Sequence, residues 1–465
     1  MYKVEEFLKL LNQGRFEEIV EILEKRDISS PSVFTILGMA YFKLGKVGKA
    51  LASFKKAVKL DPNCVDARFN LAEIYLQREK YSKAKDNIIE VLSRNPEDWA
   101  AHDILATILC FEGFYESALL VLKRAISLAP DEVRSQLKEK LDSLKIRMEI
   151  VQKLPKLAFV CGKGVDNFID DIIKGLQNDY WIQRRAVKSL KEVKAAIDWA
   201  DMVWFEWADE VAVAGTNYIG IKGKPTLVRL HSYETFSSVP LKINWQVVNM
   251  LIFVSHHMRE IFFEFFPSLK KEISNTEVVY NAVNIEKIPF KEREPGYEIA
   301  WVGYIRPVKS PAMAIQIIYE LVKKDPRYRL HFAGDHREMV IMDAYLKTII
   351  KRLGLENNVI LHGWVEDINE FLEDKNYLIH TSLHESFGYA IVEAMGRGIK
   401  PVIHWFKGAD KLYDRKWLFV SIDDAVRMIT EDVYDSSRYR SYIVEKGWTI
   451  ENQVRKIKKV LAEMR

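Results

Sequence analysis

A single carboxylate stands in the otherwise apolar stretch from Phe387 to Met395, within the segment SLHESFGYAIVEAMGRGIKPVI (382–403). That residue is Glu393, and a carboxylate is poorly tolerated in an apolar helix unless a partner satisfies it. Two partners are open at this point. Glu393 either accepts hydrogen bonds from the hydroxyl groups of a ligand, or pairs with Arg397 four residues later as a surface ion pair worth about 0.5 kcal/mol.

The residues before Glu393 favour the ligand interpretation. The pattern YLIHTSLHESFG predicts a strand that runs into a loop, after which Phe387 and Gly388 open the next helix. Amide N–H groups at a helix start attract an anion such as a diphosphate, and a glycine lets the anion approach closely. Glu393 would then lie two turns along the same helix, where it could accept hydrogen bonds from vicinal hydroxyl groups.

Composition argues against several other kinds of protein. The 465 residues hold 69 Lys and Arg against 65 Asp and Glu, and this net charge of +4 is too small to indicate a nucleic-acid partner. Weak contact with a membrane surface or an anionic ligand stays open. Three widely spaced cysteines indicate neither a disulfide framework nor a zinc site, so a reducing cytoplasm is the expected location. The first residues do not resemble a signal peptide, and no apolar run reaches the roughly 18 residues of a membrane span.

A 34-residue repeat organises the first third of the chain. Prolines and alanines recur at this period, namely Pro62, Pro96, Pro130, Ala50, Ala84 and Ala118. The stretch SVFTILGMAYFKLGKVGKALASFKKAVKLDP resembles the tetratricopeptide (TPR) pattern, in which small residues let two helices approach and proline ends the second helix. The segment 14–26 resembles a degenerate first repeat, and the segment from Asp131 a closing helix. The repeats either offer a groove to a peptide or protein partner, or serve only dimerisation or packing.

After Lys156, short apolar runs alternate with helical patterns, which is typical of α/β layers. Candidate strands fall in two sets of five: 157–161, 202–206, 226–230, 251–255 and 277–281, then 298–303, 330–335, 359–363, 377–382 and 401–405. They predict two doubly wound, Rossmann-like domains that face each other, with ligands beyond the carboxyl ends of the strands. The expected domains are 1–152 for the repeats, 155–288 for the first α/β domain and 289–465 for the second.

From the opening stretch, the chain resembles the retaining GT-B glycosyltransferases of the family 4 type. Glu385, Phe387, Gly388, Glu393 and Ala394 match that family's E-x-F-G-x-x-x-x-E-A spacing. The likeness extends over most of 157–465, because EVVYNAVN, IAWVGYIRPVKSP, LHFAGD and VILHGWVED resemble successive family segments. KGWTIENQVRKI resembles the helix that crosses back to the first domain. The resemblance implies a TPR solenoid followed by a GT-B fold, whose second domain binds a nucleotide sugar and whose first binds an acceptor.

The resemblance also implies roles for individual residues. In this family the glutamate that matches Glu393 binds the nucleotide ribose, and the one that matches Glu385 lies at the transferred sugar. Lys309 matches the phosphate-binding lysine, and a cation there stabilises the charge that develops on the departing diphosphate. The other implied donor-site residues are Gly303, Arg306, Phe387 and Gly388.

The donor loop departs from the family pattern at one position. The family usually has arginine directly after the glycine, but here Tyr304 follows Gly303, and Arg306 lies two residues further on. Arg306 either serves through a shifted loop, or the role of the arginine is weakened. A solvated basic turn is the plain alternative for both Arg306 and Lys309.

Signals for the acceptor side come from two strand ends. His231 directly follows the strand 226–230 and matches a histidine that the family often places close to the transferred sugar. A strand-end histidine without such a role is the alternative. Glu206, after the strand MVWF, either faces the same cleft or is merely exposed.

Metal and nucleophile chemistry find little support in the sequence. His380 and His384 have zinc-like spacing, yet the first falls on a predicted strand, so the two would not share a helical face. Neither H-E-x-x-H nor G-x-S-x-G occurs. We therefore expect no catalytic metal and no cofactor. The family resemblance implies a nucleotide sugar as the donor substrate, linked to UDP, GDP or ADP.

The family implies sugar transfer with retained anomeric configuration, to a glycan, lipid or protein acceptor. Two other functions stay open. The chain could be a TPR scaffold whose transferase half is degenerate, or a transferase whose repeats present a protein acceptor to the cleft.

Overall fold

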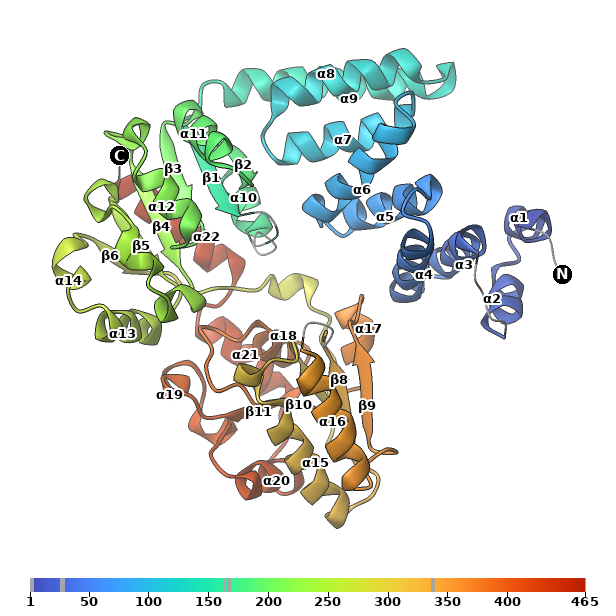
Figure 1. Cartoon of the computed structure of the whole chain (residues 1–465), viewed down its shortest axis with the longest axis vertical. Coiled ribbons are helices and arrows are strands. Elements are labelled where there is room, and N and C mark those ends of the chain that lie inside the picture. Colours follow the sequence, from blue (N-terminus) through green and yellow to red (C-terminus); the bar gives the residue numbers. More distant parts are fainter. Residues whose placement is uncertain (1–3, 26–29, 163, 165–168, 336–338, 465) are drawn as a thin grey trace. The chain divides into compact units, whose positions relative to one another are not determined.

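The computed structural model describes residues 4–25, 30–162, 164, 169–335 and 339–464 (Figure 1). The chain forms two compact units, 1–188 with 199–202 and 189–198 with 203–465. The described secondary structure is helical up to Val151, and two parallel sheets follow. The predicted order, a helical repeat solenoid followed by two Rossmann-like α/β layers, is confirmed. The predicted domain boundaries are not tested by the division into units and stay predictions.

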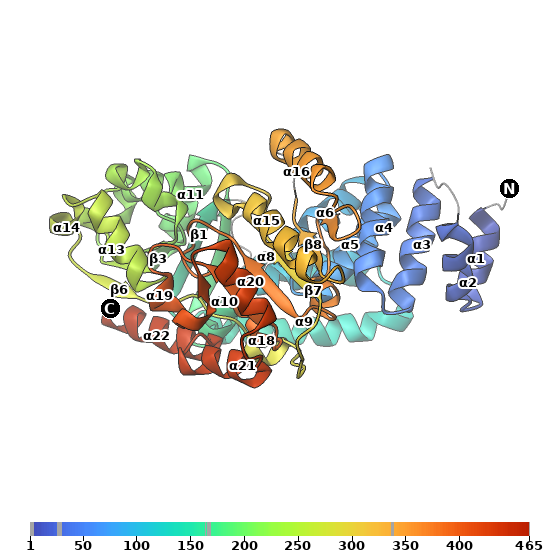
Figure 2. The same ribbon diagram turned by 90° about the horizontal axis from the view of Figure 1, so that it is seen from below.

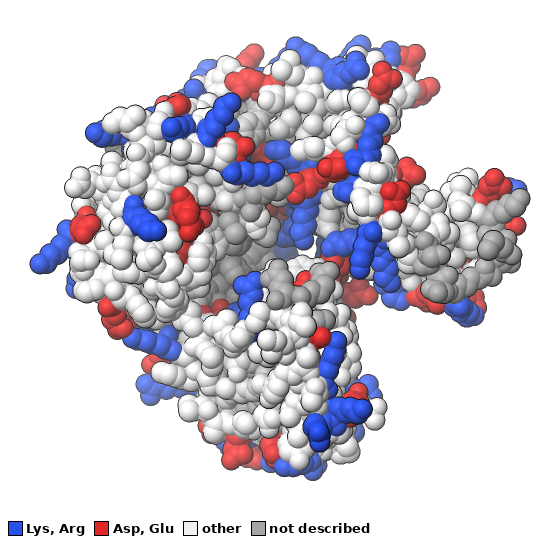
Figure 3. Space-filling model, in the orientation of Figure 1, with Lys and Arg blue, Asp and Glu red and all other residues white. Residues whose placement is uncertain are grey.

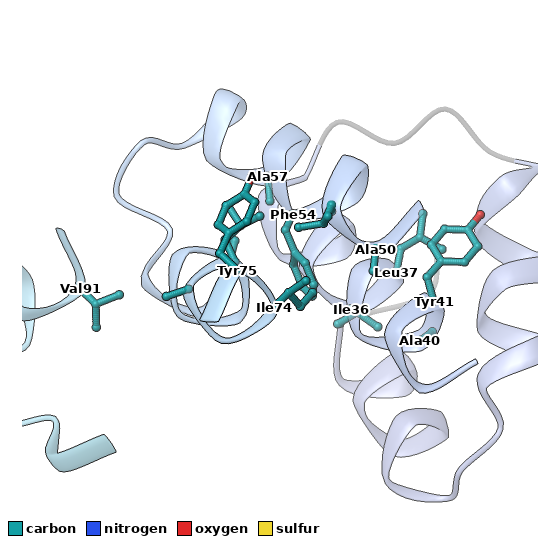
Figure 4. Packing of buried hydrophobic residues seen from close by; sticks show 14 of the residues in the cluster. Ile36, Leu37, Ala40, Tyr41, Ala50, Phe54, Ala57, Ile74, Tyr75 and Val91 are labelled. Carbon is teal, nitrogen blue, oxygen red and sulfur yellow. The ribbon is translucent and has the colours of Figure 1, made fainter. Parts of the chain in front are cut away.

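Paired helices build the repeats. They are α1 (Val4–Asn12), α2 (Phe16–Glu24), α3 (Pro31–Lys43), α4 (Val47–Leu60), α5 (Val65–Gln77), α6 (Tyr81–Arg94), α7 (Trp99–Phe111), α8 (Tyr115–Leu128) and α9 (Asp131–Val151). Gly38 of α3 is needed for close packing, because a Cβ there would lie 2.7 Å from the ring of Phe54 on α4. Ala50, Phe54 and Ala57 are fully buried in the same core (Figure 4). The small residues of the 34-residue pattern therefore lie where paired helices touch.

Two sheets follow the repeats. The first has the strand order β2-β1-β3-β4-β5-β6 and the second β12-β11-β10-β7-β8-β9. The strands are β1 (Lys156–Gly162), β2 (Trp181–Val187), β3 (Met202–Phe205), β4 (Thr226–Leu230), β5 (Met250–Phe253), β6 (Thr276–Val278), β7 (Glu298–Val302), β8 (Arg329–Ala333), β9 (Val359–Gly363), β10 (Tyr377–His380), β11 (Lys400–His404) and β12 (Leu418–Phe419). The order reverses direction between β10 and β7, and ligands of such sheets bind beyond the carboxyl ends at such a reversal.

Helices and short 3₁₀ turns connect these strands. The helices are α10 (Asp170–Leu176), α11 (Leu190–Trp199), α12 (Glu210–Thr216), α13 (His256–Phe265), α14 (Leu269–Glu272), α15 (Pro311–Lys324), α16 (Val340–Arg352), α17 (Ile368–Leu372), α18 (Tyr389–Gly396), α19 (Ala409–Leu412), α20 (Ile422–Thr430), α21 (Ser436–Glu445) and α22 (Ile450–Glu463). The 3₁₀ turns are η1 (Ile219–Ile221), η2 (Tyr233–Phe236), η3 (Val239–Lys242), η4 (Trp245–Val247), η5 (Ile285–Lys287), η6 (Pro307–Lys309) and η7 (Arg415–Trp417).

Among the described residues, each sheet has one strand more than the five predicted. β2 escapes a search for apolar runs because its centre is polar, with Gln183, Arg184 and Arg185. Arg184 is buried, and its guanidinium lies 2.7 Å from the Asp170 carboxylate. β12 holds only two residues, too few to show an alternating pattern.

The start of α22 lies against the segment that follows β6. Thr449 forms a parallel bridge with Val283. Gln453, in the first turn of the helix, donates its side-chain N–H to the carbonyl of Tyr280 over 2.8 Å. These contacts join the last helix to the chain between the two sheets.

The turn between α7 and α8 packs on β2 within the first compact unit. The N–H of Arg184 donates to the carbonyl of Glu112 over 2.9 Å, and the indole N–H of Trp181 donates to the carbonyl of Gly113 over 2.8 Å. β2 is an edge strand, so this turn occupies part of an edge that would otherwise offer unpaired N–H and C=O groups. Trp181 also belongs to the hydrophobic core that includes Leu122 and Leu144.

The mixed surface charge fits the small net charge of the chain, and the helices fit the lack of long apolar runs in the sequence. On the face shown in Figure 3, acidic and basic side chains are mixed, and wide areas carry neither kind. Of the helices that the structure describes, none combines the length and apolar character needed to cross a membrane.

Replacing Gly113 with alanine should destabilise the first compact unit strongly. Gly113 has φ +80°, and a Cβ there would lie 1.6 Å from the carbonyl oxygen of Ile182. We expect a loss of about 3 kcal/mol or more in the free energy of unfolding, because the turn must move away from β2. Urea unfolding followed by circular dichroism, with Trp181 fluorescence as a second probe, measures the change.

Gly45→Ala is the matched control, since Gly45 is the same position two repeats earlier. It has φ +72°, but a Cβ added there would meet no atom within 4 Å. The control should cost only the left-handed backbone penalty of about 1 kcal/mol. Equal losses for the two variants would show that the contact between the turn and β2 does not stabilise the protein.

Candidate functional site

Glu385 is held by three donors in the loop after β10. Its Oε1 accepts hydrogen bonds from Nε2 of His380 at 3.0 Å and from Oγ of Ser382 at 2.9 Å. Nζ of Lys309 forms an ion pair with the same oxygen. Because all three donors converge on Oε1, none of the hydrogen bonds among the described residues uses Oε2.

His380 and Lys309 keep the carboxylate of Glu385 ionised. Burial by itself raises the pKa of Glu385, but the hydrogen bond and charge of His380, together with the Lys309 cation, lower it well below the ordinary value. A carboxylate only accepts hydrogen bonds, so Nε2 of His380 carries the proton. The site therefore presents a fixed anion beside a cation.

Lys309 reaches Glu385 because two loops are bonded together. The hydroxyl of Thr381 donates to the carbonyl of Lys309 over 2.7 Å, and the N–H of Leu383 donates to the carbonyl of Val308 over 2.8 Å. Ser310, between Lys309 and α15, has φ +45°, a left-handed backbone conformation that residues other than glycine rarely adopt. The loop after β7 is thus pinned to the loop after β10, its neighbour in the sheet.

The structure places Arg306 differently from Lys309. Arg306 is exposed, and its guanidinium lies 5.1 Å from the ring centre of Tyr304. The Tyr304 ring is half exposed and lies 6.1 Å from that of Trp364. The cation paired with Glu385 is therefore Lys309, and whether Arg306 binds phosphate stays a prediction.

Gly303 has a partner that the sequence did not single out. A Cβ at Gly334, directly after β8, would lie 1.8 Å from the carbonyl oxygen of Gly303, whereas a Cβ at Gly303 would meet only ordinary contacts, the nearest at 3.6 Å. Gly334 is therefore the sterically required glycine, whereas a side chain at position 303 would fit against Trp301 and Lys309 without a clash. The signal was present in the motif LHFAGD, where glycine ends the strand.

Phe387 and Gly388 shape the start of α18. The Phe387 side chain is fully buried and packs against Trp448, with ring centres 5.2 Å apart, so only its backbone could meet a ligand. Gly388 has φ +78°, and a Cβ there would lie 2.8 Å from Cδ1 of Ile391 and 2.9 Å from the hydroxyl of Tyr413. The glycine is required by the turn itself, and it opens a helix whose first amides point toward the loop end.

Glu393 lies half-buried on α18. Nη1 of Arg397 donates to the backbone carbonyl of Glu393 over 2.8 Å, and Nη2 donates to Oδ1 of Asn369. Burial lowers the pKa of Arg397, and the nearby Glu393 charge raises it. These contacts do not decide between ribose and Arg397 as the partner of the Glu393 carboxylate, so its role stays a prediction.

A second buried polar cluster surrounds His231 at the end of β4. Nε2 of His231 lies 3.1 Å from Oε1 of Glu206, which also accepts from Nη1 of Arg229 at 2.8 Å. The indole N–H of Trp204 donates to the other Glu206 oxygen, and Arg229 also donates to Asn281. Glu206 has no exposed surface, so the exposed alternative is wrong.

Burial keeps His231 neutral, and the hydrogen bond to Glu206 orients its ring. Burial lowers the pKa of His231, although the hydrogen bond to Glu206 opposes the shift. The Trp207 ring lies 4.0 Å from the imidazole, centre to centre. Sequence reasoning missed Arg229, and the signal was a charged residue inside the apolar run TLVRL, which needs a buried partner.

The two clusters meet through the loop that follows His231. The ring of Phe236 on η2 packs edge-on against His384, with ring centres 4.7 Å apart. Burial, with the neighbouring His257, lowers the pKa of His384 to about 4, so this imidazole is neutral. The structure thus brings the loops of His231 and Glu385 into contact, within the second compact unit.

No metal site is evident in the part of the chain that the structure describes, since no group of three or more His, Cys, Asp or Glu residues is placed to hold an ion. His380 and His384 do not act as a pair: the first binds Glu385 and the second contacts Phe236. The expectation that the reaction needs no metal or cofactor stays a prediction.

Glu234 should make stability depend on pH. Its Oε1 accepts from the N–H groups of His231 and Ala208, and burial raises the pKa of Glu234 to about 8 from the ordinary 4.5. Between these values the folded protein keeps a proton that the unfolded chain releases, so the free energy of unfolding falls as the pH rises. Glu234→Gln should reduce the decline in Tm between pH 5 and pH 8.

Comparison of wild type with the variant isolates this residue, because all other titrating groups act equally on both proteins. Glu210→Gln, at an exposed position on α12, is the control and should keep the wild-type slope. Identical pH profiles for wild type and Glu234→Gln would contradict the raised pKa.

The comparisons with known proteins agree with this architecture. Residues 284–414 match the family model described as glycosyl transferases group 1, and 38–78 and 65–98 match TPR and tetratricopeptide repeat models. The GDP-mannose:cellobiosyl-diphosphopolyprenol alpha-mannosyltransferase of Xanthomonas campestris is 29% identical over 133 residues, 28% of this chain and 34% of that protein. The poly(ribitol-phosphate) alpha-N-acetylglucosaminyltransferase of Staphylococcus aureus is 25% identical over 189 residues, 38% of this chain and 37% of that protein. The chain spans about a third of the length of these curated relatives.

Solved structures share the fold of the sheet-containing part. HepE of Anabaena, solved in complex with UDP and glucose, has a TM-score of 0.54 and 19% identity, covering 66% of this chain and 100% of that one. A glycosyltransferase from Rickettsia africae has a TM-score of 0.52 and 13% identity, covering 67% of this chain and 98% of that one. Residues 38–98 therefore match tetratricopeptide repeats, residues 284–414 match the glycosyl transferases group 1 model, and the sheet-containing part has a GT-B fold.

Proposed function

We propose that this protein is a glycosyltransferase that moves a sugar from a nucleotide-diphosphate sugar to a glycan or lipid-linked glycan, with retention of the anomeric configuration. The observation that carries the proposal is the carboxylate of Glu385, fixed through Oε1 beside the Lys309 cation, in the loop that leads into α18. Its Oε2, which none of these bonds uses, is the acceptor for a hydroxyl of the transferred sugar.

Each donor-site residue has a proposed task. The Lys309 cation and the first amides of α18 bind the diphosphate, and Gly303 and Gly388 let it approach the backbone. Glu393 accepts hydrogen bonds from the ribose hydroxyls. Arg306 adds charge from the exposed side of the donor loop, in place of the arginine that Tyr304 replaces.

The proposed reaction breaks the bond between the anomeric carbon and the diphosphate oxygen and forms a bond from that carbon to the acceptor oxygen on the same face. The acceptor proton passes to the departing diphosphate, so no protein base is required. Lys309 stabilises the charge that develops on the leaving group. His231, held neutral by burial against Glu206, orients the acceptor or the sugar at the reacting carbon.

The names of the relatives support the choice of substrates. The Xanthomonas relative is named for GDP-mannose as donor and a cellobiosyl-diphosphopolyprenol acceptor, and the Staphylococcus relative for a poly(ribitol-phosphate) acceptor. Both names specify an alpha-glycosyl transfer. UDP and GDP sugars are therefore the first donors to test, with ADP sugars as the third class. The repeats are proposed to bind a protein partner. The three widely spaced cysteines, Cys64, Cys110 and Cys161, fit the proposed cytoplasmic location.

Glu393→Ala should weaken donor binding. We first identify the donor by thermal stabilisation of the wild type with UDP-glucose, UDP-N-acetylglucosamine, GDP-mannose and ADP-glucose, expecting a shift of a few degrees for one class. The variant should then raise the donor KM and weaken nucleotide binding about tenfold or more, because two ribose hydrogen bonds are lost. Isothermal titration with the free nucleotide checks this.

Glu356→Ala, at an exposed position after α16, is the control for that experiment and should bind like wild type. Unchanged nucleotide affinity in Glu393→Ala would remove this residue from the donor site. If no nucleotide sugar is turned over and none stabilises the protein, the transferase proposal fails and a binding scaffold remains. Sugar found only on a co-purified protein, by intact mass, would instead favour a protein acceptor.

Lys309→Met should lower kcat about a hundredfold with a smaller change in the donor KM. The methionine keeps the length of the side chain but removes the cation that stabilises the leaving group and pairs with Glu385. Steady-state kinetics with the identified donor measures both constants. Lys323→Met, on the exposed end of α15, should leave them unchanged, and a similar loss in both variants would refute a specific role for Lys309.

A further inference from the structure

His257 connects α13, the helix that follows β5 of the first sheet, to the backbone of Glu385. It lies in the first turn of α13, and its side chain is buried. Its Nε2 is 2.8 Å from the carbonyl oxygen of Glu385. Since a carbonyl only accepts, Nε2 carries the proton and donates. The carboxylate of Glu385 is thus held from the second sheet, while its main chain is held from α13.

One face of α13 continues this contact. His257, Glu260 and Glu264 follow the i, i+3, i+7 spacing of a single helical face. Glu260 pairs with Lys411 and Glu264 pairs with Lys407, both on the segment after β11. Figures 1 and 2 both show α13 beside α19, which holds Lys411. The same face of one helix therefore meets both the 385 loop and the 407–411 segment.

Gly408 makes the close approach of His257 feasible. It has φ +90°, and a Cβ there would lie 2.4 Å from Cβ of His257. Any side chain at position 408 would push the imidazole away from Glu385. The two ion pairs are about half exposed, so each contributes at most about 1 kcal/mol. Of the contacts that α13 makes here, the buried hydrogen bond of His257 is the one made directly to the main chain of Glu385.

We propose that His257 is a positioning residue for sugar transfer, which holds the Glu385 loop in its reactive place only when α13 is seated on the 407–411 segment. This inference rests on the proposed function, because it assigns Glu385 to the transferred sugar. His257 touches no reacting atom. It acts through the main chain of Glu385, and misplacing a reacting group by about 1 Å costs about a hundredfold in rate.

The experiment compares His257→Ala, His257→Gln and the neighbouring His256→Ala. In the alanine variant kcat for transfer from the identified nucleotide sugar should fall ten- to a hundredfold, while affinity for UDP or GDP by titration calorimetry stays within twofold. Glutamine places a side-chain N–H close to where Nε2 lies and should restore kcat to within about threefold of wild type. His256 is exposed and faces Tyr280 instead, so its replacement should change neither constant.

A second readout does not need activity. Hydrogen–deuterium exchange of the segment 381–388 should accelerate in His257→Ala and in Gly408→Ala, and keep its wild-type rate in His256→Ala. The charge swaps Glu260→Lys and Lys411→Glu should each accelerate it slightly, and the double swap should reverse this. Unchanged exchange and unchanged kcat in His257→Ala would overturn the inference. Faster exchange in a protein that turns over no sugar would sustain the positioning contact while the proposed function fails.

Discussion

A buried, charged carboxylate is tolerated only where donors surround it, and Glu385 draws its donors from two neighbouring strand ends. His380 and Ser382 come with β10, and Lys309 comes with the loop after β7. β7 and β10 lie side by side at the reversal of strand order. The sheet topology therefore creates the meeting point, and the charge on Glu385 holds the two loops there.

The same requirement organises the first sheet. Arg229 points from the middle of a buried strand and needs an acceptor, which Glu206 and Asn281 supply. Buried ion pairs add little net stability, but breaking one is costly, so such a cluster favours one arrangement of its members. His231 is part of this arrangement, and its orientation follows from the pairing of its neighbours rather than from its own contacts with solvent.

Local patterns were sufficient to predict much of this architecture. The 34-residue period identified the repeats, and apolar runs located ten of the strands, because burial on both faces leaves a continuous apolar signal. β2 and β12 were missed, the first because Gln183 and Arg184 are polar yet buried, the second because two residues carry no period. Glu385 and Lys309 came from family spacing, whereas Glu393 was also indicated physically, as a lone carboxylate in an apolar stretch.

Contacts between distant parts of the chain could not be predicted in this way. His257 and Glu385 are 128 residues apart, and Arg229 and Asn281 are 52 apart, so no local pattern joins them. Gly334 lay within a quoted motif, but its need for a bare Cα depends on Gly303, which approaches from the neighbouring strand. The roles of such residues can be identified only from the folded structure, which shows the partner that each of them contacts.

The α7–α8 turn packs on β2, so the edge of the first sheet depends on the repeats for part of its hydrogen bonding. A fragment that begins at β1 would bare the main-chain groups beside Arg184 and the indole of Trp181. Open strand edges recruit other copies of the same chain. The repeats therefore cover part of this edge, and a chain without them is expected to associate more readily with itself.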